Sequence, residues 1–399
     1  MLPLKTILLG VTGGIAAYKA VSLLRLLLKQ DIAVQVVMTA SAKRFVGETT
    51  FQALSAKPVW SDLWDSRINN QMAHIELAKS SQLIVIAPAS ANILFKLAHG
   101  VADDLLSTLC SARGCPLWVA PAMNRSMWDN PANQRNIGLL KQDGVNFLGP
   151  DCGMQACGDV GEGRMLEPEA LAALISAFFQ PKLMQQQRVL VTAGATFEAI
   201  DPIRGLSNRS SGKMGFAIAR AAAEAGAIVH LIAGVTDLAT PNGVRRTDVV
   251  NAAQMLVAVN AEITNADIFI SVAAVADYCL AKPATQKIKK DKTDHLSLTL
   301  VPTTDIIAHI AALPSAPFCV GFAAETEALV MQAEAKRKRK KLPLLVANLA
   351  QSTIGCDEAE VVLLDDFGQH QLPRAPKLEV ARAIVAHIAG LYQRYLSVS

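Results

Sequence analysis

Two cysteines stand among glycines in DCGMQACGDVGEGRM, residues 151–165, a stretch without helical or strand periodicity. Cysteines in such a segment can ligate a metal, form a disulfide or supply a proton. Cys110 and Cys115 repeat the C-x4-C spacing, but structural zinc sites usually have tighter C-x2-C knuckles. We therefore interpret the stretch as a glycine-hinged flap that presents Cys157 as a general acid, with Cys152 incidental.

Small and polar residues follow three other apolar runs of the first half. LIVIAPASAN and LWVAPAMN each pass through Ala-Pro-Ala to an asparagine, Asn92 or Asn124, and a further run ends at Met38-Thr39. Asparagine offers both a donor and an acceptor, and small residues let a flat ring approach the backbone. In open parallel sheets ligands lie beyond the carboxyl ends of strands, so we expect a crevice there that suits FMN better than NAD.

The turn after the first apolar run, GVTGGIAAYK, lacks the second glycine of a dinucleotide fingerprint and has Thr12 instead. It can hold a monophosphate through the Thr12 hydroxyl and the amides of a helix N-terminus; the alternative is a tight turn that binds nothing. The flavin-site residues that we predict are Thr12, Gly13, Gly14, Thr39, Pro88, Ala89, Ser90 and Asn92.

The second half contains GLSNRSSGKMG, which is not a P-loop because six residues separate Gly205 from Gly212 and Met214 follows the lysine. Ser210 or Ser211 can still cap a helix that starts near Gly212, where an anion could bind.

Acidic, aromatic and basic residues follow the later apolar runs of this half. We expect the strand DIFISVAAVADYCLA to end at Asp277, which can contact a metal or a ribose or merely cap a helix, and another strand to end at Phe322. The run KRKRKK, residues 336–341, is a solvated face or a nucleic-acid patch in its usual interpretations. Lys336 and Lys340, however, lie on one helical face and could reach a triphosphate, and no stacking-aromatic pattern accompanies them. A polar loop adds Lys287, Lys289 and Lys290.

Both halves begin as strand, glycine-rich turn, helix and strand. This alternation predicts an α/β protein with two doubly wound, Rossmann-like parallel-sheet domains. We place the domains at 1–183 and 188–399, with the linker near 181–187, where FFQPKLMQQQ interrupts the pattern.

The composition limits the class of protein. Hydrophobic residues make up 51% of the 399, with mean hydropathy +0.29, but Pro, Ser and Asn interrupt the apolar stretches before bilayer length. The start MLPLKTILLGVTGG superficially resembles a signal peptide, yet Gly13-Gly14 breaks its apolar core. Seven scattered cysteines favour a reducing cytoplasm. The net charge of +4 suits anionic small molecules rather than nucleic acid.

The motifs GGIAAYK, HIEL, APAMN and QACGDVGEGRM resemble those of phosphopantothenoylcysteine decarboxylases, which belong to the homo-oligomeric flavin-containing cysteine decarboxylases. The motif SNRSSGKMGFAIA resembles the phosphopantothenate–cysteine ligases. Together they make nearly the whole chain similar to the bifunctional coenzyme A biosynthesis proteins. The resemblance implies that His74 acts in oxidation and decarboxylation, that Asn124 holds the substrate carboxylate and that Cys157 protonates an enethiol intermediate. A lone histidine such as His74 is otherwise more often structural than catalytic.

For the second half the resemblance implies catalytic roles for Asn208 and Arg204 in an acyl-cytidylate step and for Lys287. The implied CTP contacts are Asp277, Lys287, Thr303, Thr304, Asp305, Ile306, Phe322, Lys336 and Lys340. The chain departs from bacterial relatives at TTDI, residues 303–306, where they typically carry Asn-Pro-Asp-Ile, and threonine offers a hydroxyl but no amide.

The function implied is the ligation of cysteine to 4'-phosphopantothenate with CTP and Mg²⁺, followed by FMN-dependent decarboxylation to 4'-phosphopantetheine. No metal ligands are assigned. The resemblance also implies self-association, as a dodecamer or another homo-oligomer built from trimers and dimers, without nucleic acid or membrane partners. Two rivals from other classes are an NAD(P)-dependent reductase and a nucleic-acid-binding scaffold that uses KRKRKK.

Overall fold

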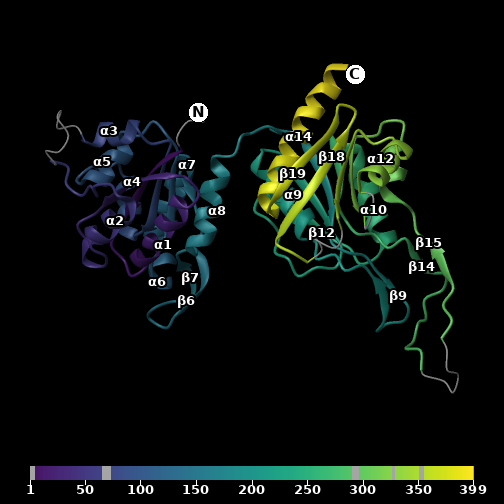
Figure 1. Cartoon of the computed structure of the whole chain (residues 1–399). Helices are drawn as coiled ribbons and strands as arrows, with labels where there is room; N and C mark the ends of the chain where they lie inside the picture. Colours follow the sequence, from purple (N-terminus) through teal and green to yellow (C-terminus); the bar gives the residue numbers. More distant parts are fainter. Residues whose placement is uncertain (1–4, 65–72, 290–295, 326–328, 350–354, 399) are drawn as a thin grey trace. The chain divides into compact units, whose positions relative to one another are not determined.

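The computed structural model describes residues 5–64, 73–289, 296–325, 329–349 and 355–398. The chain forms two compact units, Met1–Phe179 and Gln180–Ser399, each of which is built on its own sheet (Figure 1). No described helix is both long and apolar enough to cross a bilayer.

The first unit contains a five-stranded parallel sheet in the order β2-β1-β3-β4-β5. Its strands are β1 (Thr6–Val11), β2 (Ala33–Met38), β3 (Leu83–Ala89), β4 (Leu117–Pro121) and β5 (Asn146–Phe147). The order reverses between β1 and β3. A crevice that can hold a ligand opens at such a switch point. In flavodoxin-like sheets of this order, FMN binds there.

Helices cover both faces of this sheet because its strands are apolar on both sides. Ile7 and Leu9 of β1 join the core under one set of helices, and Leu8 joins the opposite core. The first set comprises α1 (Ala17–Leu28), α2 (Glu48–Ser55) and α8 (Pro168–Phe178). The opposite set comprises α3 (Ala73–Lys79), α4 (Ala91–Ala98), α5 (Leu105–Ser111), α6 (Arg125–Trp128) and α7 (Pro131–Gln142).

The cysteine–glycine stretch forms an antiparallel hairpin of β6 (Asp151–Met154) and β7 (Val160–Arg164). The expectation of a segment without strands was therefore wrong. Its glycines obscured the alternation because two of them, Gly161 and Gly163, occupy β7 itself.

The second unit has an eight-stranded sheet in the order β12-β11-β8-β13-β16-β17-β18-β19. The strands are β8 (Arg188–Ala193), β11 (Ile228–Ala233), β12 (Val244–Asp248), β13 (Ile268–Ser271), β16 (Phe318–Glu325), β17 (Leu344–Leu349), β18 (Glu358–Asp365) and β19 (Gly368–Pro376). The six strands from β12 to β17 are parallel, whereas β18 and β19 add an antiparallel edge. The predicted class of two doubly wound parallel sheets is confirmed, with this hairpin as an unforeseen extension.

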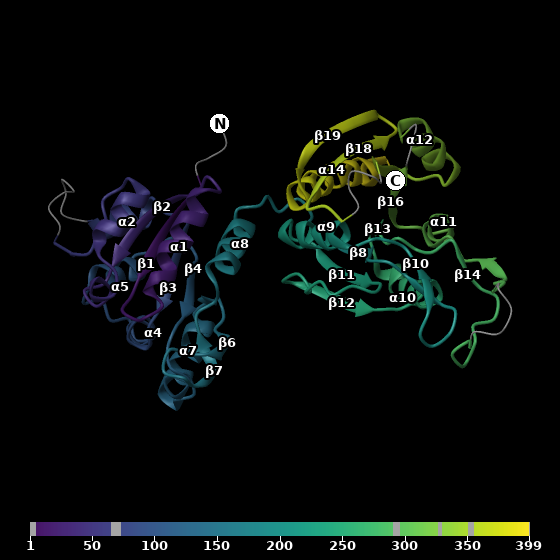
Figure 2. The same ribbon diagram turned by 60° about the horizontal axis from the view of Figure 1, so that its bottom comes forward.

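Two helices, α9 (Lys213–Glu224) and α14 (Lys377–Val398), pack on one face of the large sheet. The other face carries α10 (Ala252–Glu262), α11 (Ile306–Ala311) and α12 (Leu329–Arg339). Two short antiparallel pairs extend from the sheet (Figure 2): β9 (Phe197–Ala199) with β10 (Gly205–Ser207), and β14 (Tyr278–Leu280) with β15 (Leu300–Pro302). Two single 3₁₀ turns, η1 (Ala42–Arg44) and η2 (Ile263–Asn265), also occur among the described residues.

Three local predictions in this unit need correction. The strand expected to reach Asp277 ends at Ser271, so Asp277 lies in the loop before β14, and Phe322 lies within β16 rather than at its end. Neither serine caps α9, whose N-cap is Gly212 in a left-handed conformation without a side-chain cap. Apolar, small residues after Ser271 mimic a longer strand, although only an isolated bridge between Ala274 and Ala195 continues the pairing beyond β13.

Candidate functional sites

The crevice of the first sheet is fixed by Thr12, which follows β1 at the switch point. Its hydroxyl donates to the Pro88 carbonyl at 2.7 Å and accepts from the Ser90 amide at 3.0 Å. Thr12 is buried, and its hydroxyl ties β1 to the end of β3. A phosphate contact of this hydroxyl stays a prediction, and the backbone and neighbouring side chains are further groups that can hold an anion.

The two glycines after Thr12 differ in the space that a Cβ atom would find. A Cβ on Gly13 would lie 2.5 Å from the Cβ of Ser41, so close packing of the loops demands glycine there. A Cβ on Gly14 would meet nothing within 4 Å. Ser90 N-caps α4 through its hydroxyl, and Asn92, two positions later, is exposed. The open space at Gly14 and these polar groups fit a phosphate-bearing flavin.

Asn124 and Cys157 are brought together across the hairpin. Asn124 N-caps α6, its Oδ1 accepting from the Ser126 amide at 2.8 Å. Its Nδ2 donates to the Cys157 sulfur at 3.1 Å and to the Asp159 carboxylate at 2.7 Å. The Cys157 Sγ lies 3.4 Å from the same carboxylate oxygen. The carboxamide, thiol and carboxylate thus form one exposed polar group at the hairpin tip.

Asp159 was not selected from the sequence, although it stands two positions after Cys157 in the quoted motif. The hydrogen bonds from Asn124 first, and then from Cys157, hold the pKa of its carboxyl below the usual value. Asp159 is therefore a carboxylate near neutral pH, and it orients both neighbours.

The hairpin is docked through backbone and side-chain hydrogen bonds. The Met123 amide donates to the Gly163 carbonyl at 2.9 Å, and Arg125 donates from its guanidinium to the Val160 carbonyl at 3.1 Å. Trp128 donates from Nε1 to Glu162 at 2.9 Å. A Cβ on Gly163 would lie 2.5 Å from the Met123 carbonyl oxygen, so this glycine permits the close approach.

His74, on α3, is half-buried, and its Nδ1 atom is buried without a hydrogen-bond partner among the described residues. An unpaired buried ring nitrogen is costly unless a further group satisfies it. Among the described residues Asn124 and Cys157 are in direct contact, whereas no hydrogen bond joins His74 to either of them, and its catalytic role stays a prediction.

The four cysteines considered for a metal site do not form one. Cys110 is buried in α5 whereas Cys152 and Cys157 are exposed on the hairpin, and all seven cysteines are free thiols. Burial raises the pKa of the Cys110 thiol to about 12, which disfavours the thiolate that zinc requires.

In the second unit a cavity of about 370 Å³ lies where the sheet order reverses between β8 and β13. Its lining includes the predicted residues Asn208 and Phe322. Asn208 donates from Nδ2 to the Ala274 carbonyl at 3.0 Å, which fixes its amide at the cavity. Ser210 and Ser211, which the sequence placed beside a possible anion, also line the cavity, whereas sequence reasoning missed the polar lining residues Arg209, Lys213, Asn348 and Lys377.

Two of the missed residues give the cavity positive charge. Lys213 begins α9 and pairs with Asp357 at 2.6 Å. Lys377 begins α14, and burial first and then repulsion by Lys213 lower its pKa. Two lysines at one cavity suit an anionic ligand, because desolvated ammonium groups gain most from a negative partner.

Arg204 is connected to the segment that carries Lys287. Its guanidinium pairs with the buried Asp201 at 2.6 Å and donates to the Ile288 carbonyl at 2.9 Å, while the Ile288 amide donates to Asp201 at 3.2 Å. The Arg204 hydrogen bonds hold the pKa of Asp201 well below its usual range. Lys287 itself is exposed, and Lys290 lies outside the described residues.

Four of the other predicted nucleotide residues form two pairs of contacts. Thr303 donates its hydroxyl to the Ala276 carbonyl at 2.5 Å, and its amide donates to the Asp277 carbonyl at 2.9 Å. Asp305 N-caps α11 and pairs with Lys340 at 2.5 Å. Burial opposes ionisation of the Asp305 carboxyl, but the hydrogen bond from Lys340 lowers its pKa below the usual value. None of these residues lines the described cavity.

The basic run of α12 is not one uniform solvated surface. Arg337 is buried and pairs with Glu334 at 2.9 Å and with Asp366 at 2.8 Å. Lys340 of the same run is also paired, with Asp305, so at least two of the six basic side chains are used internally, which counts against a nucleic-acid patch.

Residues 184–392 match the family described as the DNA/pantothenate metabolism flavoprotein C-terminal domain, and residues 1–180 match the Flavoprotein family. The Coenzyme A biosynthesis bifunctional protein CoaBC of Vibrio vulnificus (strain YJ016) is 46% identical over 97% of this chain and 98% of its own. The chain belongs to this bifunctional family. The protein of the same name from Escherichia coli (strain K12) is 44% identical over 97% of each chain.

A crystal structure of the C-terminal domain of a Coenzyme A biosynthesis bifunctional protein CoaBC is 34% identical, with TM-score 0.47, over 53% of this chain and 99% of that one. The predicted family, the coenzyme A biosynthesis function and the pairing of a decarboxylase with a ligase are confirmed by the family matches and the full-length relatives. In this bifunctional family member the flavoprotein domain comes first, as the motifs predicted.

Proposed function

We propose that the chain joins cysteine to 4'-phosphopantothenate at the expense of CTP in its second domain and decarboxylates the product in its FMN-dependent first domain. We set the domains at 1–183 and 188–399. The observation that carries the first assignment is the Asn124–Cys157–Asp159 group on the docked hairpin. The second rests on the lysine-lined cavity at Asn208.

Bound FMN would supply the two-electron oxidation of the substrate thiol that makes loss of CO₂ feasible. The residues assigned to hold it are Gly13 and Gly14, Thr39, Pro88 to Ser90, and Asn92, with Thr12 fixing the crevice. Asn124 is assigned to bind the substrate carboxylate through its carboxamide. Cys157 is assigned to supply the proton that the enethiol carbon accepts, and Asp159 keeps the thiol beside Asn124.

In the second domain the pantothenate carboxylate must be activated before an amine can attack it. Attack on the α-phosphorus of CTP gives an acyl-cytidylate and releases pyrophosphate; the cysteine amine then displaces CMP. Lys213, Lys377 and a bound Mg²⁺ would neutralise charge on the phosphates. Asn208 is assigned to the acyl group, while Arg204 positions the segment of Lys287.

We also propose a cytoplasmic location, since seven free thiols suit a reducing compartment. Self-association through both domains, as a trimer-and-dimer-based homo-oligomer such as a dodecamer, remains part of the proposal. The unpaired His74 Nδ1 is consistent with a site that another group completes.

One assay tests both assignments. Purified protein is mixed with 4'-phosphopantothenate, cysteine and CTP, and pyrophosphate and CO₂ are followed together. We expect both, with pyrophosphate first, and a yellow protein. Pyrophosphate that forms equally without cysteine would contradict the ligase assignment. The absence of CO₂ from supplied 4'-phosphopantothenoylcysteine would contradict the decarboxylase assignment. Replacing CTP by ATP measures nucleotide preference.

A further inference from the structure

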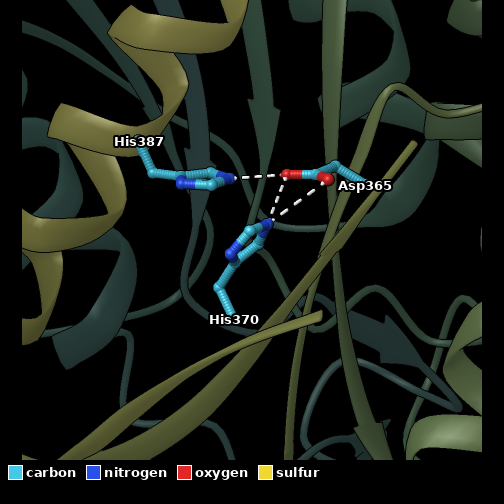
Figure 3. A group of neighbouring side chains, drawn as sticks. All are labelled: Asp365, His370 and His387. Carbon is cyan, nitrogen blue, oxygen red and sulfur yellow. Dashed lines mark hydrogen bonds and ion pairs between the residues drawn. The ribbon is translucent and has the colours of Figure 1, made fainter. Parts of the chain in front are cut away.

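Two histidines converge on one buried carboxylate at the antiparallel edge of the second sheet (Figure 3). Asp365 ends β18, His370 lies on β19 and His387 lies on α14. The Nε2 of His387 lies 2.7 Å from Oδ2 of Asp365, and the Nε2 of His370 lies 3.2 Å from the same oxygen. None of the three residues lines the described cavity.

The arrangement exceeds what is needed to satisfy a buried carboxylate. The Asp365 side chain is only 1% exposed, and it already accepts from the Phe367 amide at 2.7 Å and from His387. His370 adds only long contacts, at 3.2 and 3.4 Å. Its ring is nevertheless aimed at the carboxylate, with its centroid 4.7 Å from that of His387.

We propose that Asp365, His370 and His387 bind a divalent transition-metal ion, for which Zn²⁺ is the best match. The three ligand atoms lie within 4.8 Å of one another, and this is the single such group of three or more in the described ranges. Two imidazoles and a carboxylate suit zinc. Magnesium prefers oxygen ligands, so this site differs in chemistry from that of the Mg²⁺ proposed for ligation.

The distances need little adjustment. Around a tetrahedral zinc with bonds of about 2.0–2.2 Å, neighbouring ligand atoms are about 3.3–3.5 Å apart. Of the two distances to the carboxylate, that of His370 is already near this separation, and His387 would move back by roughly 0.6 Å. The two histidine nitrogens lie within 4.8 Å of each other. The Phe367 amide fixes Oδ1 of Asp365, which orients Oδ2 as the ligand in the manner of an outer-shell partner.

Access and charge also favour the ion. The side chain of His370 is 42% exposed and that of His387 is 24% exposed, so an ion can enter from solvent and water can complete its coordination. The carboxylate of Asp365 also contributes negative charge, which favours a cation. The adjacent Asp366 is already paired with Arg337.

The bound ion would fasten α14 to the β18–β19 hairpin. These three elements follow all other described elements in sequence, and β18 is the one described strand that pairs with β19. An ion that binds the folded chain and not the unfolded one raises stability by mass action, so the site has a stabilising role separate from both reactions.

The test uses the full chain without a histidine tag, stripped with EDTA and titrated with Co²⁺ or Zn²⁺ in equilibrium dialysis. We expect one ion per chain. His370→Gln and His387→Gln should each weaken binding at least tenfold, whereas His309→Gln, an exposed histidine of α11, should not. Zn²⁺ should raise the melting temperature of the parent and of His309→Gln, but not that of His370→Gln or His387→Gln.

Thiols are the competing ligands in this chain. Electron paramagnetic resonance of the Co²⁺ form separates the two cases, since imidazole nitrogens couple to the ion and oxidised flavin is silent. Failure of the parent to bind stoichiometrically, equal binding by His370→Gln, or a sulfur-ligated signal would each overturn the proposal. His370 is the more exposed ring, so its variant decides the matter if His387→Gln does not fold.

Discussion

Asn124 donates a hydrogen bond to the sulfur of Cys157 at 3.1 Å although 33 positions separate them in the chain. The contact exists because the β6–β7 hairpin folds back over α6, the helix that Asn124 caps. A substrate carboxylate bound at the asparagine amide would therefore lie beside the thiol, which places binding and proton transfer at the same point.

Cys157→Ser should stop the last step of the first reaction. A serine hydroxyl is a far weaker acid than a thiol, so we expect the decarboxylated, still oxidised intermediate to accumulate and phosphopantetheine formation to fall by about 10²-fold or more. Mass spectrometry of the products measures both. Cys152→Ser, on the same hairpin and equally exposed, is the matched control and should behave as the parent; an unchanged yield in Cys157→Ser refutes the assignment.

Asp159→Asn should slow the decarboxylase by about tenfold or more because a neutral amide holds the thiol and Asn124 less firmly. The folded pKa of Asp159 is depressed, so its ordering of the hairpin tip is present above about pH 4, the ordinary range of an aspartate, and is lost only as pH falls below it. The pH profile of the parent between 5 and 8 should therefore show no titration of this group. Asp143→Asn, on an exposed helix end, serves as control, and a rate equal to the parent's in Asp159→Asn would exclude the role.

Thr12→Val should lower the free energy of unfolding of the first domain by about 1–3 kcal/mol. The methyl group leaves the Ser90 amide and the Pro88 carbonyl without their buried partner. Chemical denaturation followed by flavin release measures the change. Thr49→Val, at an exposed position of α2, should stay within about 0.5 kcal/mol. A Thr12 variant as stable as this control would show that the hydroxyl bridge contributes little.

The roles of Thr12, Asp159 and the cavity lysines illustrate which features the sequence can and cannot reveal. Strand-end positions such as Asn92 and Asn124 follow from apolar runs and small residues, which are local signals. The partner of the Thr12 hydroxyl lies 76 positions away, and Lys213 meets Asp357 only after α9 packs on the sheet. Which partners the Thr12 hydroxyl and the Lys213 ammonium group find depends on tertiary packing, so the sequence alone could not predict these contacts.

The same reasoning explains the misplaced strand ends. Apolar, small residues between Ser271 and Asp277 satisfy any strand pattern, yet the carbonyls of Ala274 and Ala276 accept from the side chains of Asn208 and Thr303. Loop carbonyls used as acceptors leave no mark in composition.

Asn208→Ala should stall ligation while sparing the flavin reaction. Loss of a fixed donor or acceptor at the activated acyl group is expected to cost about 10²-fold in the rate of pyrophosphate release. Supplied 4'-phosphopantothenoylcysteine should still lose CO₂ at the parental rate. Asn242→Ala, exposed and outside the cavity lining, is the control. Loss of both activities in Asn208→Ala would indicate misfolding in place of a ligase defect.

Thiol labelling should separate the buried cysteines from the flap cysteine. Burial raises the pKa of both Cys110 and Cys319 to about 12, so at pH 8 neither forms appreciable thiolate, the species that alkylating reagents attack. Mass spectrometry of the native chain after iodoacetamide should find Cys157 and the exposed control Cys356 modified and these two intact until denaturant is added. Labelling of Cys110 at the rate of Cys356 would mean that α5 opens readily, since a thiol enclosed in that core cannot meet the reagent otherwise.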